Sequence, residues 1–191
     1  MIVELINTGS ELMLGRVLNT HQQWLCRRLA DLGYVVTRQV AVPDTGSDIE
    51  QAVREALARA DLIIATGGLG PTSDDLTRDL VAKLLGKELH EDATVLVHIR
   101  SFFESRKRAM PERTKVQAMV PDGATVLHNP HGTAPGLAME VRPNPFRPAA
   151  SQAGLSCCPV HRGSCVRCSP TRSRRCFGEC CRWRAGLCVA R

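Results

Sequence analysis

A chain of 191 residues, 43% of them hydrophobic, is long enough to bury the core of one domain and short for two. No stretch reaches the ~18 consecutive apolar residues of a membrane span, and the first twenty residues, with Glu4, Glu11 and Arg16, lack the apolar run of a signal peptide. The composition therefore argues against a membrane protein and predicts a cytoplasmic one.

Charge and cysteine are concentrated near the carboxyl end. Residues 142–191 contain ten arginines, no lysine and one acid, Glu179, together with eight of the nine cysteines. Residues 1–141 hold 18 acidic and 15 basic side chains, so the net charge of +6 comes from the later segment. The sequence predicts a domain over residues 1–141, incomplete at its carboxyl end, and a disordered or frameshift-derived tail over residues 142–191.

The first predicted elements are a strand, a helix and a second strand. Residues 2–6 are apolar except for Glu4 and lead into a turn at Gly9, which is typical of a buried strand. Leucines at helical spacing over residues 18–32 predict a helix that Gly33 ends. The β-branched residues of 34–42, followed by a Pro-Asp-Thr-Gly turn, predict the second strand.

The alternation of strands and helices then continues. Residues 47–50 match a capping box at the start of a helix, and residues 62–65 form a strand that is apolar on both faces. The further predicted elements are helices over residues 76–85 and from Val95, and strands over residues 125–127 and 137–141. This pattern predicts an α/β domain of three αβα layers around a mostly parallel, doubly wound sheet.

The clearest chemical signal is the glycine-rich loop between the strand at 62–65 and the next helix. Ligands of such sheets bind where the strands end, and glycines let the backbone approach an anion next to the first amides of a helix. The residues predicted to bind phosphate are Thr66, Gly67, Gly68, Gly70, Thr72 and Ser73. The loop has neither the Gly-Lys-Ser/Thr of a P-loop nor a third dinucleotide-binding glycine, which argues against NTPases and dehydrogenases.

Three carboxylates accompany this loop. Asp44, Asp74 and Asp75 would repel a phosphate unless a divalent cation such as Mg²⁺ lay between them, so they are candidate metal ligands. A structural interpretation is also open. Thr72 and Asp75 can form a capping box, and Asp44 stands in an ordinary Pro-Asp-x-Gly turn.

Residues 66–77, Thr-Gly-Gly-Leu-Gly-Pro-Thr-Ser-Asp-Asp-Leu-Thr, resemble the signature of the CinA family (competence/damage-inducible protein A). More loosely they resemble the molybdopterin-binding domains of molybdenum cofactor biosynthesis. Residues 8–12, 42–44 and 129–136 agree in order, so the resemblance covers residues 2–141. It implies a nucleotide pyrophosphatase that hydrolyses ADP-ribose with a divalent cation, or a module that binds a molybdopterin-like or nucleotide phosphate without turnover. It also implies self-association into a homo-oligomer.

The resemblance gives Asp44 and Asp75 the positions of acidic site residues. In the resulting hypothesis these two are catalytic and, with Asp74, hold the metal that polarises the phosphoanhydride and activates water. The residues expected to border the pocket are Ser10, Glu11, Asn19, Asn129, Gly132 and Thr133.

The tail has no predicted strand or helix, no family-like continuation and no recognisable amidase domain. Its Arg, Cys, Ser and Pro content resembles a GC-rich coding sequence read in the wrong frame, so we favour a frameshifted or truncated product, and an inactive fragment is the third functional hypothesis. A zinc site at Cys165, Cys168, Cys176 and Cys180 or Cys181 is the alternative. Phe146, Phe177 and Trp183 are too scattered to stack bases, which argues against nucleic-acid binding.

Overall fold

The computed structural model of the chain describes residues 1–147 and 153–159, and its centre is a six-stranded sheet. The strands of this sheet are β1 (Val3–Thr8), β2 (Val36–Val42), β3 (Leu62–Thr66), β6 (Thr125–Leu127), β7 (Gly136–Val141) and β8 (Ala153–Cys158). They lie in the order β2-β1-β3-β8-β7-β6. The first four run parallel and β7 is antiparallel to both its neighbours, which confirms the predicted mostly parallel α/β sheet.

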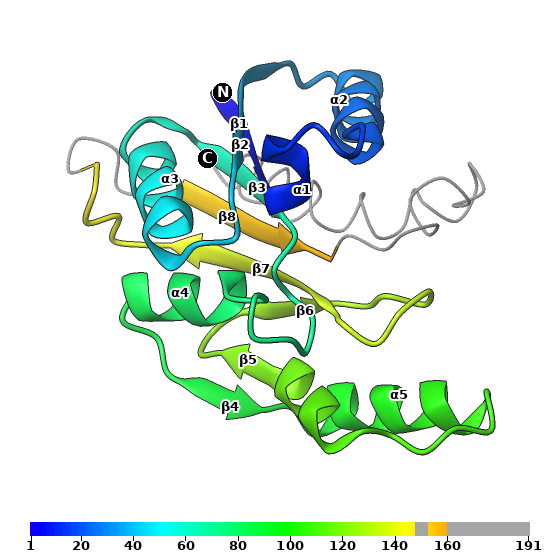
Figure 1. Cartoon of the computed structure of the whole chain (residues 1–191). Helices are drawn as coiled ribbons and strands as arrows, with labels where there is room; N and C mark the ends of the chain where they lie inside the picture. Colours follow the sequence, from blue (N-terminus) through cyan, green and yellow to red (C-terminus); the bar gives the residue numbers. More distant parts are fainter. Residues whose placement is uncertain (148–152, 160–191) are drawn as a thin grey trace.

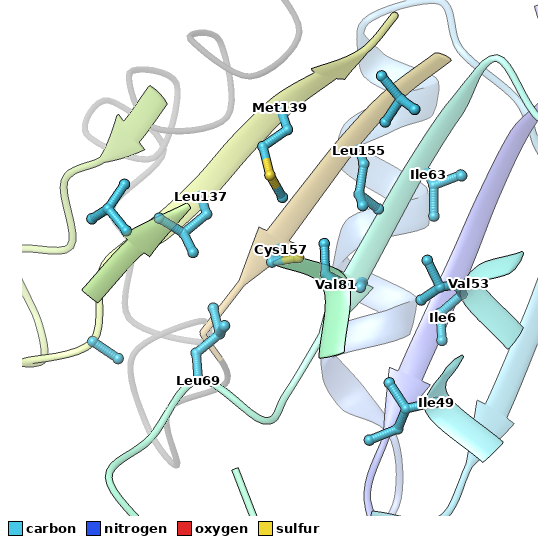
Figure 2. Close-up of a cluster of buried hydrophobic side chains, with 14 of the residues drawn as sticks. Ile6, Ile49, Val53, Ile63, Leu69, Val81, Leu137, Met139, Leu155 and Cys157 are labelled. Carbon is cyan, nitrogen blue, oxygen red and sulfur yellow. The ribbon is translucent and has the colours of Figure 1, made fainter. Parts of the chain in front are cut away.

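Helices cover both faces of the sheet because each presents an apolar stripe to it. Helices α3 (Gly46–Arg59) and α4 (Thr77–Leu84) pack on one face, and α2 (Thr20–Asp31) packs on the other (Figure 1). The core under α3 and α4 includes Ile6, Ile49, Val53, Ile63, Val81, Leu137, Met139 and Leu155 (Figure 2). No helix among the described residues has both the length and the apolar character needed to cross a bilayer.

A smaller unit lies beside the sheet, next to α4. It consists of the antiparallel pair β4 (Leu89–Glu91) and β5 (Met119–Pro121), helix α5 (Ala93–Glu104) and the 3-10 helix η1 (Glu112–Ala118). Asp92 caps α5, because its carboxylate accepts hydrogen bonds from the backbone N–H groups of Thr94 and Val95. The buried residues of the smaller unit belong to the same core cluster as those of α3 and α4, so this unit is packed onto the domain.

Two of the predicted helix starts differ from the structure. The cap of α3 is Thr45, whose hydroxyl accepts from the Asp48 amide, and not Ser47. Helix α4 begins only at Thr77, so the Thr72–Asp75 pair lies within the loop before the helix and does not cap it. At both sites the residue types favour a turn, and a turn is present. The residue at which the helix begins depends on how the helix packs on the sheet.

The sequence predicts no strand after residue 141, and this is wrong, because residues 153–158 form strand β8. Strand β8 lies inside the sheet, parallel to β3 with Ile64 opposite Ser156, and antiparallel to β7 with Met139 opposite Leu155. Pairing on both sides satisfies its backbone, and Leu155 and Cys157 are buried in the core. The cysteines proposed as zinc ligands, Cys165, Cys168, Cys176, Cys180 and Cys181, lie outside the described residues.

Glu4, the polar exception in the first predicted strand, is buried in β1 and paired. Its two carboxylate oxygens accept from Nε of Arg59 at 2.7 Å and from a terminal guanidinium nitrogen at 3.0 Å. This bidentate pair ties the end of α3 to the sheet and raises the pKa of Arg59, mainly through the hydrogen bond to Glu4. The charge in an otherwise apolar strand is therefore compensated.

A prediction concerns Asp61, at the amino end of β3. One of its oxygens accepts from the Ile2 amide at 2.7 Å and the other from Arg147 at 2.8 Å. Burial acts to raise the pKa of Asp61, but the Ile2 amide and Arg147 together outweigh it, and the net pKa is lowered. A lowered folded-state pKa means that the ionised group stabilises the fold above its ordinary pKa and that this stability is lost as pH falls through the folded value.

We therefore expect Asp61→Asn to lower the free energy of unfolding by about 1 kcal/mol at pH 7. The difference from the wild type should shrink as pH falls below the ordinary aspartate pKa, because the wild-type carboxylate is then protonated too. Urea titrations at a series of pH values measure this, with exposed Asp122→Asn as the control. A difference that stays constant down to the acid limit would contradict the role of the charge.

Candidate phosphate-binding site

The predicted site residues follow strands that end at one edge of the sheet. Strands β1, β2, β3 and β8 are parallel, so their carboxyl ends meet there, and β7 starts at the same edge because it runs antiparallel to β8. Hydrogen bonds link these ends: the Gly9 amide donates to the Val42 carbonyl at 3.0 Å, and the Gly67 amide donates to the Cys158 carbonyl at 3.3 Å. This is the edge where parallel sheets bind their ligands.

Gly67 and Gly68 turn the chain out of β3 in conformations that other residues avoid. Their φ angles are +102° and +65°. A Cβ on Gly67 would lie 2.8 Å from the carbonyl oxygen of Thr8, and one on Gly68 would lie 2.9 Å from Cβ of Thr77. The amide of Thr77 also donates to the Gly68 carbonyl at 3.0 Å. The loop is therefore held tightly between the end of β1 and the start of α4.

The second half of the loop is organised by Asp75. Its Oδ2 accepts from the backbone N–H of Thr72 at 2.9 Å and from the Thr72 hydroxyl. A Cβ on Gly70 would meet this carboxyl group, with Cγ at 2.7 Å. Ser73 donates to the neighbouring Asp74 at 3.2 Å. The structure thus brings Thr72 and Asp75 together in a hydrogen bond that closes the loop and does not cap α4.

Asp44 lies where β2 ends and pairs with Ser10, the first residue of the short helix α1 (Ser10–Met13). The Ser10 amide donates to Asp44 Oδ2 at 2.9 Å, and the Asp44 amide donates to the Ser10 hydroxyl at 3.2 Å. Glu11 follows on the exposed side of α1. Two predicted site residues from different strand ends are therefore in contact, and each fixes the backbone of the other.

A polar network that the sequence did not reveal lies next to these residues. The Thr66 hydroxyl donates to Asn7 Oδ1 at 3.0 Å, and Asn7 Nδ2 donates to Gln22 Oε1 at 3.1 Å. Asn19 caps α2 by accepting from the Gln22 amide at 3.0 Å and also donates to Gln22 Oε1. Thr66 and Asn19 thus connect β3 to α2 through buried or half-buried hydrogen bonds, which is a supporting role.

Three buried polar groups around the glycine loop have no hydrogen-bond partner within residues 1–147 and 153–159. They are the Thr77 hydroxyl, Nε of Arg78 and Oε1 of Gln117. Gln117 donates its amide to the Leu69 carbonyl at 3.4 Å, and Arg78 is only 3% exposed, with Asp79 accepting from it at 2.8 Å. Arg78 was not predicted; its one signal was a cation in the first helical turn, where the helix dipole disfavours it.

The structure gives a specific test of the predicted metal site. In the described ranges no three histidine, cysteine, aspartate or glutamate side chains converge as a metal-binding group, so Asp44, Asp74 and Asp75 do not form a ready cage. Asp44 and Asp75 each use Oδ2 in loop hydrogen bonds, which leaves Oδ1 of each carboxylate for other contacts. These donors fit a cation that takes most of its ligands from elsewhere, as Mg²⁺ does when it binds with substrate phosphates.

The chain is similar to known proteins over most of this fold. Residues 4–161 match the family model described as a probable molybdopterin binding domain. The chain is 50% identical over 137 residues to a CinA-like protein of Akkermansia muciniphila, which covers 72% of this chain and 33% of the relative. It is also 50% identical over 139 residues to a putative competence-damage inducible protein of Geobacillus sp. (strain WCH70), a match that covers 73% of this chain and 33% of that relative. The chain thus spans about a third of the length of these curated relatives.

Solved structures agree with the sequence comparison. The crystal structure of the protein CinA with unknown function from Thermoplasma acidophilum superposes with a TM-score of 0.69 at 31% identity, covering 82% of this chain and 86% of that one. The tungsten cofactor synthesizing protein MoaB from Pyrococcus furiosus shares the fold, with a TM-score of 0.56 at 17% identity over 93% and 90% of the two chains. This chain belongs to the CinA family and carries its molybdopterin-binding-like domain.

Proposed function

We propose that the domain binds a phosphate group, carried by a nucleotide such as ADP-ribose or by a pterin, at the loop of residues 67–70. The observation that carries the proposal is the backbone of Gly67 and Gly68, held in left-handed conformations at the carboxyl edge of a parallel sheet. Gly67 and Gly68 carry no side chains of their own, and the loop leads directly to the start of α4.

Positive potential at the loop comes from α4 and from Arg78. The first amides of a helix have no acceptor within it. In α4 the Thr77 amide donates to the Gly68 carbonyl, and the cap residue, Leu76, makes no side-chain hydrogen bond to the amides that follow. Arg78 places a buried guanidinium directly after Thr77, which contacts Gly68. That guanidinium pairs with Asp79 at 2.8 Å, and its Nε has no acceptor among the described residues, so a phosphate that reached Nε would supply one.

We further propose that the bound phosphate belongs to a phosphoanhydride and that the domain hydrolyses it. Asp44 and Asp75 would hold a divalent cation such as Mg²⁺ together with the substrate's phosphates, and the cation would supply the positive charge that polarises the anhydride. With ADP-ribose, water adds to one phosphorus, the bridging P–O bond breaks, and AMP, ribose 5-phosphate and two protons are released. The alternative is a module that holds the same phosphate without turnover.

The experiment combines calorimetry with product analysis on the purified chain. We expect ADP-ribose to bind saturably, and AMP and ribose 5-phosphate to accumulate when Mg²⁺ is present. Binding without products would support the module in place of the hydrolase, and absence of binding by both ADP-ribose and a pterin phosphate would refute the site. Light scattering on the same preparation tests the homo-oligomer that we propose for the domain.

Asp75→Asn separates the carboxylate's charge from its role in the loop. Asparagine keeps an oxygen that can accept from the Thr72 amide, so the loop conformation and the affinity for ADP-ribose without metal should be retained. Hydrolysis should fall on the order of 100-fold, because the negative ligand for the cation is lost. Asp44→Asn should behave alike and Asp122→Asn should be neutral. Unchanged metal-dependent hydrolysis in Asp75→Asn would remove Asp75 from the mechanism.

A further inference from the structure

The loop of residues 129–136 lies at the same sheet edge as the glycine loop. A Cβ on Gly136, where β7 begins, would lie 3.3 Å from the Cys157 carbonyl oxygen, and the carbonyl of the next residue, Cys158, accepts from Gly67. The end of β8 therefore separates the two loops by the width of one strand. The loop of residues 129–136 is therefore a neighbour of the proposed phosphate position.

Two sets of hydrogen bonds hold the loop of residues 129–136. Asn129 braces it from within, since its Nδ2 donates to the Ala134 carbonyl at 2.9 Å and its Oδ1 accepts from the His131 amide at 3.1 Å. A second contact comes from α5, because Nε2 of His98 lies 3.1 Å from the carbonyl oxygen of Gly132. Gly132 is buried, so its carbonyl needs a donor that water cannot easily replace.

The chemistry of this contact determines that one ring nitrogen of His98 carries a hydrogen. A carbonyl oxygen only accepts, so Nε2 of His98 must carry the hydrogen. The ring is held in place by His128, which meets it edge-on with centroids 4.7 Å apart and planes at 74°, and by the more distant ring of Phe102. His98 thus presents a donor of fixed direction to the middle of the loop.

We propose that His98 is a positioning residue, which holds the loop of residues 129–136 in the conformation that receives the part of the ligand beyond the phosphate. The expected effect of His98 on ligand binding rests on the proposed function. The anchoring of the loop of residues 129–136 by His98 does not. His98 belongs to the small unit beside the sheet, so the hydrogen bond also couples that unit to the phosphate site. The same unit also contacts the glycine loop, where Gln117 of η1 donates to the Leu69 carbonyl at 3.4 Å.

The test uses two amide variants with different reach. In His98→Gln the side-chain amide nitrogen can occupy the position of Nε2 and donate to Gly132, whereas in His98→Asn the shorter side chain cannot reach it. We expect His98→Asn to speed amide hydrogen exchange in residues 129–136 of the ligand-free protein about five- to tenfold and to weaken ADP-ribose binding by a similar factor. His98→Gln and the exposed control Arg100→Gln should stay within about twofold of the wild type.

Each result decides a separate point. Unchanged exchange in His98→Asn, or equal effects of the asparagine and glutamine variants, would overturn the anchoring by this hydrogen bond. Faster exchange with unchanged ADP-ribose affinity would overturn the role in the pocket. If the wild type binds neither ADP-ribose nor a pterin phosphate, the proposed function fails, and the exchange measurement still determines whether His98 positions the loop. Urea unfolding of every variant confirms that the compared proteins are folded.

Discussion

Gly68→Ala is expected to abolish phosphate binding and to lower the free energy of unfolding by about 2–5 kcal/mol. The new methyl group would lie 2.9 Å from Thr77 Cβ and 3.0 Å from the Thr77 amide nitrogen. In addition, the backbone of residue 68 has a φ of +65°. Relief requires the loop or the start of α4 to move, and either movement disturbs the proposed anion site. Urea unfolding and calorimetry with ADP-ribose measure the two effects.

The matched control is Gly86→Ala, at the other end of the same helix. Gly86 has a φ of +62°, but no atom lies within 4 Å of the position its Cβ would take. This variant therefore carries the conformational cost alone, about 1 kcal/mol, and should keep full affinity. If Gly68→Ala matched Gly86→Ala in stability and bound ADP-ribose normally, the close approach of Gly68 and Thr77 would have no functional meaning.

Arg59→Leu is expected to cost about 3 kcal/mol of stability. It leaves the carboxylate of Glu4, whose side chain is 3% exposed, without its bidentate partner inside the fold. Because the Arg59 side chain is itself 33% exposed, the loss should be at the lower end of what breaking a buried ion pair costs. Urea unfolding at pH 7 provides the measurement.

A double-mutant cycle isolates the pair. Replacing both partners, in Glu4→Leu with Arg59→Leu, removes the unpaired charge and should recover most of the stability, to within about 1 kcal/mol of the wild type. The control Lys115→Leu breaks the exposed Lys115–Glu112 pair and should change stability by less than about 0.5 kcal/mol. A double variant no more stable than Arg59→Leu would show that packing, and not the buried charge, sets the cost.

The strands and helices with a clear pattern of apolar residues were predictable from the sequence. Those that form only because they pair with neighbouring strands were not. Apolar runs at residues 2–6 and 62–65 matched β1 and β3, and the leucine spacing before Gly33 matched α2. The segment Ala153–Cys158 has no β-branched residue, so nothing in its own sequence favours a strand; its pairing with β3 and β7 does. The short pair β4–β5 escaped prediction because each strand has three residues.

The candidate site shows the same division. The glycine loop could be named from local turn chemistry, and Ser10 and Asp44 from the family resemblance. The topology of parallel strands brings them to one edge. Asn7, Gln22 and His98 act through partners that lie 15 to 59 residues away, and no short motif encodes such contacts. Arg78 was missed because its significance lies in its burial, which depends on the tertiary packing of α4.

The central position of β8 has a consequence for synthesis on the ribosome. Within the described sheet, β3 and β7 have no direct pairing and are joined only through β8, which is the last strand in chain order. Until residue 158 has left the exit tunnel, the nascent chain can hold two separate half-sheets, each with an unpaired inner edge. The domain would then close in one late step, and the edge that carries Gly67 and Gly136 would form only at that moment.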